Sequence, residues 1–368
     1  MAGPLSGIKL LEFAGIGPGP FCGMILADMG AEVIRIDRSS QHGKGNTIDF
    51  QHRSKLSLSA DLKNPQTVNE IKKLLKSVDG LIEGFRPGVM ERLGLGPDEC
   101  LKINPNLIYG RMTGWGQDGP LAKTAGHDIN YIALTGALEL MGRKGETPPP
   151  PLNLVGDFGG GGMFLALGIV SGLLNIKQGG KGQVVDAAMV DGASVLMSMF
   201  YAFKASGFWL EERESNMLDG GAHFYDTYEC SDKKFLAIGS IEPQFYEELL
   251  NKLGISDQKF QDQHNRDQWP ELKTIIKNKI KEKTRDEWAD IFDGSDACVA
   301  PVLNLSEAPE HHHMKARNSF VEIDGTIQPA PAPRFSNTNT EIQHPSVKAG
   351  ENNDEICAKY NLDRSCFS

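Results

Sequence analysis

The chain has 368 residues, 40% of them hydrophobic, which is enough for one large domain or two smaller ones with substantial cores. Its formal net charge of -10 disfavours nucleic acid and anionic membrane surfaces as general partners, because both select basic proteins. The six cysteines are scattered and form no C-x-x-C pair, so we expect reduced thiols in an intracellular protein.

Residues 1–206 predict an α/β fold, because short apolar strands alternate with helical segments from the start of the chain. Strands are expected at residues 8–13, 33–36, 56–58, 80–83, 107–112 and 183–185. Helices are expected at residues 20–29, 65–77, 159–175 and 189–205. A parallel, doubly wound sheet is the simplest arrangement of these elements.

A second unit is expected from about Phe224, after a charged and irregular stretch. Its predicted elements are strands at 225–228 and 235–238 and helices that start at Pro243, Trp269 and Arg285. The pattern Thr284-x-x-Glu287 is a capping box that marks the start of the last helix. The sequence thus predicts a large domain at 1–206, a linker at 207–223, a small domain at 224–327 and a segment at 328–368 that returns to the large domain.

The longest apolar run, Met163 to Leu174, is about twelve residues long, so we expect a buried helix rather than a membrane span. No charged region followed by an apolar stretch begins the chain, so a secretory signal is not expected. The final residues 365–368 do not match a Ser-Lys-Leu-type peroxisomal address.

The glycine-rich segment Gly15–Gly19 lies between a predicted strand and a predicted helix, as a dinucleotide-binding turn would. Its glycine spacing does not fit, and Pro18 and Pro20 lack the backbone donors that a pyrophosphate needs. A tight strand-to-helix turn is therefore favoured over NAD(P) binding. The run His311–His313 does not predict a metal site, because three consecutive helical residues point in different directions. His223, beside two glycines, is left open between a loop residue and a site residue.

Basic residues are concentrated between Arg35 and Arg92, where eleven Lys and Arg face seven Asp and Glu in an otherwise acidic chain. Several lie at predicted strand ends, where open α/β sheets bind ligands. These residues are Arg38, Arg53, Lys55, Lys63, Arg86 and Arg92. As a group they favour a phosphorylated ligand, although each alone is better explained as a surface charge.

His127 and Asp157 are the candidate acid–base pair, and each stands beside glycine. An imidazole and a partly desolvated carboxylate on opposite sides of one carbon can remove a proton from one face and return it to the other. Asp157 has an alternative structural explanation, because an aspartate before Gly159–Gly162 can cap the following helix. The two explanations are compatible, since a helix N-terminus also stabilises anions.

Several motifs resemble the family III coenzyme A transferases over nearly the whole chain. They are the segments Leu26–Asp37, Arg86–Val89, Asn104–Tyr109, Gly114–Pro120 and Gly180–Gln183. Three further segments resemble one branch of that family, the α-methylacyl-CoA racemases: Gly126–Tyr131, Asn216–Gly221 and Ile241–Tyr246. The resemblance implies a Rossmann-like large domain, a smaller α+β domain and an interlocked homodimer.

The resemblance also implies roles for individual residues. His127 and Asp157 match the two catalytic bases, and Glu242 matches a carboxylate that orients the histidine, within one chain or across the dimer. Matches to positions that hold the coenzyme A thioester are Arg38, Ser59, Ala60, Asp61, Leu62, Lys63, Arg86, Arg92, Gly126, Asp128, Ile129, Asn130 and Tyr131. No separate cofactor and no metal is implied, because coenzyme A is part of the substrate.

The implied reaction interconverts (R)- and (S)-2-methylacyl-CoA thioesters through an enolate, in branched-chain fatty acid and bile-acid precursor metabolism. Backbone donors near Asp157 are candidates for holding the enolate. The alternative is coenzyme A transfer with Asp157 as the nucleophile, which gives His127 no obvious task. A binding protein for coenzyme A esters would need neither residue. Family members in animals are expected in peroxisomes and mitochondria.

Overall fold

The computed structural model describes residues 3–368, which form two compact units. Unit 1 comprises the chain up to Thr135, Pro151–Met197 and His312–Ser368, and unit 2 comprises Gly136–Pro150 and Ser198–His311. Residues 136–150 and 198–206, expected in the large domain, therefore group with unit 2, and residues 312–327, expected in the small domain, group with unit 1. Sequence composition could not predict which unit these segments join, because that depends on packing between residues far apart in the chain.

Unit 1 is built on the predicted parallel sheet, which has six strands in the order β3-β2-β1-β4-β5-β6. The strands are β1 Lys9–Phe13, β2 Glu32–Arg38, β3 Lys55–Ala60, β4 Gly80–Glu83, β5 Ile108–Thr113 and β6 Gln183–Ala188. All neighbours pair in parallel, so the predicted fold class is confirmed. Because β1 lies between β2 and β4, the order reverses there, which is where such sheets bind ligands.

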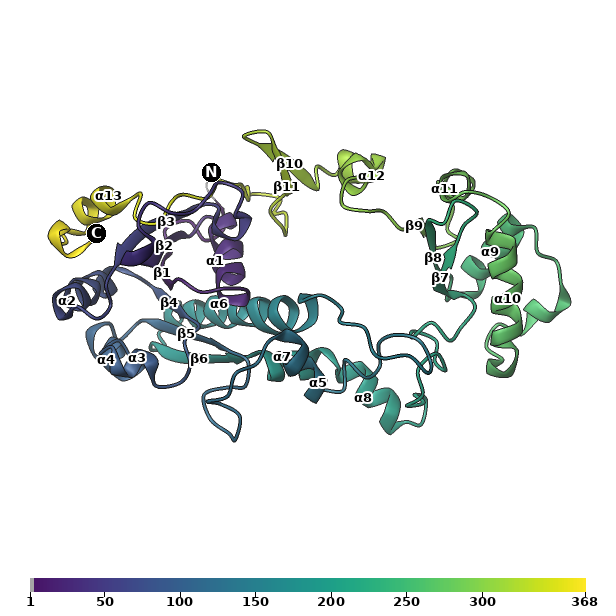
Figure 1. Ribbon diagram of the computed structural model, residues 1–368, viewed down its shortest axis with the longest axis horizontal. Helices are drawn as coiled ribbons and strands as arrows, with labels where there is room; N and C mark the ends of the chain where they lie inside the picture. The colour runs from purple at the N-terminus through teal and green to yellow at the C-terminus, as the bar shows by residue number, and fades with distance from the viewer. Residues whose placement is uncertain (1–2) are drawn as a thin grey trace. The chain divides into compact units, whose positions relative to one another are not determined.

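Helices cover both faces of this sheet. Consecutive strand residues point to opposite faces, so Leu10 packs with α1 Pro18–Asp28 and α6 Phe164–Lys177, whereas Leu11 packs on the other face. The second face is covered by α2 Pro65–Leu74, a 3-10 turn at Leu75–Ser77, α4 Pro97–Ile103 and α13 Asn353–Tyr360. Figure 1 shows α6 along the sheet beside β4, β5 and β6.

The helix expected at residues 159–175 is longer than predicted. A π-helical segment, Leu154–Met163, runs directly into α6, so that the combined helix covers Leu154–Lys177. By length and composition alone this helix could cross a membrane, and 44% of its most apolar stretch is buried within the protein. Its glycines allow close packing, since a Cβ at Gly162 would stand 2.8 Å from the carbonyl oxygen of Pro18.

Other elements of unit 1 are shorter. They are α3 Val89–Arg92, α5 Asp128–Leu134, α7 Met189–Leu196, α12 His312–Ala316 and the hairpin of β10 Phe320–Ile323 and β11 Thr326–Pro329. Unit 1 also has 3-10 turns at Ser39–Gln41, Phe50–His52 and Arg364–Cys366, and a further 3-10 turn, Ala308–Glu310, lies in unit 2. The single helix expected at 189–205 is instead two, because α8 Ser198–Ala205 belongs to unit 2.

Unit 2 is the predicted α+β unit. Its antiparallel sheet contains β7 Tyr225–Glu229, β8 Phe235–Gly239 and β9 Val299–Pro301. Its helices are α9 Pro243–Leu253, α10 Trp269–Ile280 and α11 Arg285–Phe292, with 3-10 turns at Gln258–Gln261 and Arg266–Gln268. The capping box is confirmed, because Thr284 accepts from the Glu287 amide and Glu287 accepts from the Thr284 amide.

Candidate active site in unit 1

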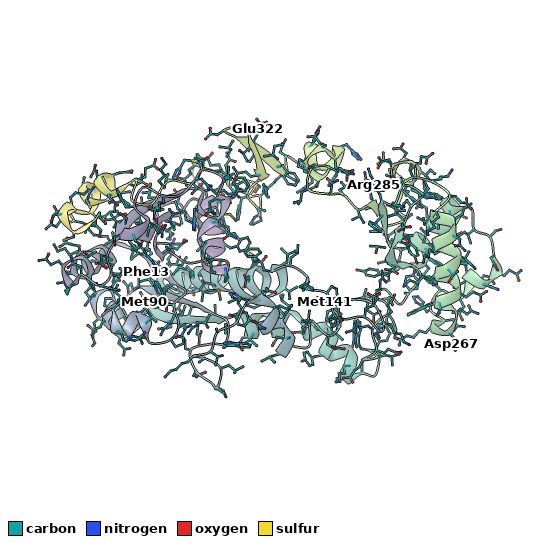
Figure 2. All side chains as sticks on the ribbon, in the orientation of Figure 1. Phe13, Met90, Met141, Asp267, Arg285 and Glu322 are labelled. Carbon is teal, nitrogen blue, oxygen red and sulfur yellow. The ribbon has the colours of Figure 1, made fainter. Side chains whose placement is uncertain are left out.

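A cavity of about 540 Å³ lies where the strand order reverses, at the carboxyl ends of β1, β4 and β5. Its walls come from the loops after these strands, which include Gly15, Phe85 and Trp115. Phe13, labelled in Figure 2, ends β1 and stacks edge-on against Phe85 with ring centroids 6.3 Å apart. Both His127 and Asp157 line the same cavity, so the structure brings the predicted acid–base pair together.

His127 is an exposed residue held by its backbone at the start of α5. Its N–H donates to Asn130 Oδ1 at 3.0 Å, and its carbonyl oxygen accepts from the Asn130 N–H at 2.8 Å. The preceding Gly126 has a packing role, because a Cβ there would approach the Tyr131 ring to 2.7 Å. Tyr131 in turn donates to the Gly126 carbonyl oxygen, and these contacts fix the direction from which His127 enters the cavity.

Asp157 lies in the first turn of the π-helical segment and is half-buried. The structural alternative for this residue is wrong: Asn153, not Asp157, occupies the N-cap position. Asn153 Nδ2 donates to Asp157 Oδ2 at 3.1 Å, and the Asp157 N–H donates to Asp128 Oδ1 at 2.6 Å. Because that N–H is occupied, the backbone donors expected near Asp157 for an enolate would be other N–H groups, and this expectation stays a prediction.

The surroundings of Asp157 favour its protonated form. Burial raises the pKa of the Asp157 carboxyl above its ordinary value, and the negative charge of Asp128 raises it further. The hydrogen bond from Asn153 and the nearby His127 act in the opposite direction but do not cancel the effect of burial. A carboxyl group with a raised pKa keeps its proton to higher pH than an ordinary aspartate, which suits it to act as a proton donor.

The basic residues divide into two groups. Arg38 and Arg86 are exposed and line the cavity, where they can meet phosphate groups. Arg53 and Lys55 are buried instead, and the proposal that they meet a ligand is wrong. Arg53 Nη2 pairs with Asp28 Oδ2 at 2.6 Å.

Lys55 has an equally complete set of internal partners. Its Nζ lies 2.7 Å from Glu12 Oε2, with both side chains fully buried, and donates to the Pro20 carbonyl oxygen at 2.9 Å. Pro20 itself lines the cavity, so this pair supports the wall without facing a ligand.

The other residues matched to coenzyme A binding lie outside the cavity lining, apart from Gly126 and Tyr131. Ser59 and Ala60 are buried at the end of β3, where Ser59 Oγ lies 2.9 Å from His42 Nδ1. The exposed ones are Asp61, Lys63, Arg92, Ile129 and Asn130, and Leu62 is partly buried. Their contacts with a thioester remain predictions.

Two further candidate site residues, Glu242 and His223, lie in unit 2. Glu242 is exposed and immediately precedes α9, and its predicted action on His127 stays a prediction. His223 is fully buried, and its Nε2 lies 2.7 Å from the Tyr246 hydroxyl. Burial and the nearby His264 lower the pKa of His223 to about 3, so it is a neutral core residue.

The cavity also contains residues that were not predicted as site residues. The turn Gly15–Gly19 is confirmed as a strand-to-helix turn, but it also forms one wall, with Ile16 83% exposed. Met112 and Met189 add apolar surface. The position of the turn at the end of β1 was the available signal, because ligands of doubly wound sheets bind beside such turns.

The strand order and the cavity at its reversal point define a Rossmann-type ligand-binding unit. Residues 5–353 match the model of CoA-transferase family III, and the chain belongs to that family. It is 46% identical to proteins named alpha-methylacyl-CoA racemase from mouse and from human; each alignment covers 98% of this chain and 94% of the relative. The crystal structure of a CAIB/BAIF family protein from Brucella suis superposes with a TM-score of 0.84 at 25% identity, covering 98% of this chain and 100% of that one. The resemblance drawn from the motifs is thereby confirmed.

Proposed function

We propose that this protein is an isomerase that interconverts (R)- and (S)-2-methylacyl-CoA thioesters. The observation that carries the proposal is the presence of His127 and Asp157 in one cavity at the strand ends. The 46% identity to proteins named alpha-methylacyl-CoA racemase supports the same activity. The cavity offers an imidazole and a carboxyl group to the same substrate carbon, as a two-base reaction requires.

The reaction begins when the thioester carbonyl makes the proton on carbon 2 acidic. In the (S)-to-(R) direction, neutral His127 takes that proton, and the electron pair of the broken C–H bond forms the enolate. Protonated Asp157 then delivers its proton to the opposite face of carbon 2, which reforms the thioester carbonyl. The raised pKa of Asp157 supports its part as the acid, and the roles exchange in the reverse direction.

The charged part of the coenzyme is assigned to Arg38 and Arg86. Both are exposed on the cavity wall, and an arginine can donate two hydrogen bonds to one phosphate group. The apolar residues Ile16, Met112 and Met189 provide surface for the acyl chain. Anchoring the coenzyme would hold carbon 2 between the two bases without tight burial of the chain.

The competing function is coenzyme A transfer, in which Asp157 would attack the thioester and form a mixed anhydride. The family name and the position of Asp157 fit this reaction as well. The racemase is favoured because His127 also lines the cavity and is not needed for anhydride exchange.

We also propose that two chains form an interlocked homodimer in which Glu242 of one subunit orients His127 of the other. Support comes from apolar side chains that unit 1 leaves exposed. Leu134 is 63% exposed, Leu167 is 62% exposed and Leu174 is 55% exposed, and apolar side chains of this size would be covered in an interface. Light scattering of the purified protein would test this, since a monomeric mass would overturn it.

The test of the activity is incubation with an (S)-2-methylacyl-CoA in deuterium oxide, without a second carboxylic acid. Incorporation of deuterium at carbon 2 with loss of stereochemical purity, abolished in His127→Ala, is expected for the racemase. Absence of exchange, together with transfer of coenzyme A to an added acid, would replace this proposal by the transferase. Roles in bile-acid precursor metabolism and a peroxisomal or mitochondrial location are proposed by family analogy, and fractionation of cells would test the location.

A further inference from the structure

Asp128, the residue after His127, is buried beneath the site instead of facing the cavity. It is 7% exposed, and it is absent from the residues that line the cavity. We propose that Asp128 is a positioning residue that ties the backbone of Asp157 to the start of α5, so that the two proton-transfer groups keep a fixed spacing. This inference rests on the proposed function and adds a residue to its site.

The contact that carries the inference joins two elements that are distant in sequence. Asp128 Oδ1 accepts from the Asp157 N–H at 2.6 Å. The first N–H groups of a helix have no partner within that helix, so this acceptor satisfies a donor that would otherwise be unpaired. Since His127 and Asp128 are neighbours, a single hydrogen bond connects the short segment that carries the imidazole to the residue that carries the carboxyl group.

The sequence makes room for this contact. Residue 156 is glycine, and a Cβ at that position would collide with Asp128 Oδ1. Gly156 is buried, and so is Asp128. A larger residue at 156 would therefore displace the carboxylate from the Asp157 N–H.

The second oxygen of Asp128 is unusual. Within residues 3–368, Asp128 Oδ2 is a buried atom with no hydrogen-bond partner. An unpaired buried carboxylate oxygen costs stability, so this arrangement calls for an explanation. Here the negative charge lies beside Asp157 and favours the protonated form of that carboxyl, so the same residue fixes the spacing and supports the acid.

Few other charged or titratable groups face Asp157. Across from it, the segment that begins α5 presents His127, Asp128 and Tyr131, while its own helix presents the neutral Asn153. The turn at the start of α1 presents Gly17 and Pro18, which do not titrate. The charged groups on the other neighbouring elements are Arg38 and Arg86, which line the same cavity, and the exposed Asp191 of α7, which packs against the segment of Asp157. A pH effect of changing Asp128 is thus attributable to few neighbours.

The experiment compares wild type with Asp128→Asn and Asp128→Ala. Asparagine keeps an oxygen acceptor at nearly the same place but removes the charge, whereas alanine removes both. Hydrogen–deuterium exchange of a peptide covering residues 154–163 reports on the Asp157 amide and does not depend on activity. We expect exchange at that amide to be about tenfold faster or more in Asp128→Ala and near wild type in Asp128→Asn.

Kinetics supply the second readout. In Asp128→Ala we expect kcat for deuterium incorporation to fall about 10²-fold with little change in KM, because a misplaced acid–base pair affects the chemical step. In Asp128→Asn we expect kcat to be close to that of the wild type. The limb of the pH profile that reports Asp157 should move to lower pH, because the charge of Asp128 no longer raises the pKa of Asp157. Asp191→Asn, which changes an exposed carboxylate in the first turn of α7, is the matched control and should leave all readouts unchanged.

Equal protection of the amide in all three proteins would overturn the contact. Lost protection with unchanged kcat would overturn the positioning role. Failure of the proposed function is a separate result, because it would show as absence of deuterium incorporation in the wild-type protein. In that case the amide measurement would still decide whether Asp128 holds Asp157.

Discussion

Gly17 lies directly opposite the carboxylate of Asp157: a Cβ at residue 17 would stand 3.0 Å from Asp157 Oδ2. Gly17 also has a φ of 69° and a ψ of -118°, a conformation that only glycine adopts without strain. The absence of a side chain at residue 17 therefore leaves space beside the carboxyl group of Asp157.

Gly17→Ala is expected to lower kcat/KM for deuterium incorporation by tenfold or more, because the methyl group covers Asp157 and strains the turn. Gly254→Ala is the control, since Gly254 has a φ of 68° but no atom within 4 Å of an added Cβ. Stopped-time exchange assays on both variants, with thermal unfolding to confirm folding, would check this. Wild-type activity in folded Gly17→Ala would show that the space over Asp157 is unused.

Asp157→Asn is expected to abolish exchange while stabilising the protein above the pKa of Asp157. The sign follows from the raised pKa: the folded state prefers the protonated carboxyl, so stability is lost as the pH rises through the folded pKa and the carboxyl becomes charged. Asparagine is neutral at every pH and avoids this loss. The measurement is the melting temperature of both proteins between pH 4 and pH 8, and a gain at pH 4 equal to that at pH 8 would contradict the reasoning.

Asn153→Ala is expected to move the pH profile in the opposite direction to Asp128→Asn. The hydrogen bond from Asn153 Nδ2 lowers the pKa of Asp157, so its removal raises that pKa further and shifts the corresponding limb of the rate profile to higher pH. Profiles of kcat/KM for both variants would test this, and shifts of the same sign would not be compatible with the contacts described.

Arg86 and Arg53 are expected to respond differently to the same substitution. Arg86→Gln should raise KM for the thioester about tenfold or more with little loss of stability, since charged hydrogen bonds contribute about 1.5–3 kcal/mol and the side chain is exposed. Arg53→Gln should instead lower the free energy of unfolding by about 3–5 kcal/mol, because it leaves Asp28 buried without its partner. Urea denaturation and steady-state kinetics of both variants separate the two effects.

Lys55→Met is expected to destabilise the protein by about 3–5 kcal/mol, since Glu12 would remain fully buried without its counter-charge. The double variant Lys55→Met, Glu12→Leu should recover much of that loss, because apolar residues replace a whole buried pair at little cost. Urea denaturation of the single and double variants would measure the coupling, and equal destabilisation in both would show that the ion pair itself is not the source.

The sequence predicted the sheet well because the pattern of each strand is local. Residues such as Leu10 and Leu11 lie in short apolar runs, and buried parallel strands need nothing else to be recognised. The boundaries of the two units and the start of the helix at Leu154 were not predictable in this way. Both depend on close backbone packing around glycines such as Gly162. In the sequence, a glycine indicates a flexible backbone but does not show which segment packs against it.

The presence of His127 and Asp157 in one cavity was predictable, because a histidine and an aspartate beside glycine are typical of an acid–base site. The roles of the residues around this pair could not be predicted, because they depend on the direction in which each side chain points. Lys55 and Arg86 look alike in the sequence, but one points into the core and the other into the cavity. Asp128 was assigned to ligand binding by its motif, and only the fold shows its carboxylate beneath Asp157.

The last residues of the chain shield an open edge of the sheet. β3 is an edge strand, and along it Asn352 Oδ1 accepts from the Ser57 N–H, Asn353 Oδ1 accepts from the Ser59 N–H, and Phe367 forms a bridge with Ala60. During translation this edge is made early and covered last, so the nascent chain passes through a stage in which unpaired strand donors are available to other chains. Until residues 352–367 are made and pack there, the unpaired donors of β3 are open to pairing with a strand of another chain.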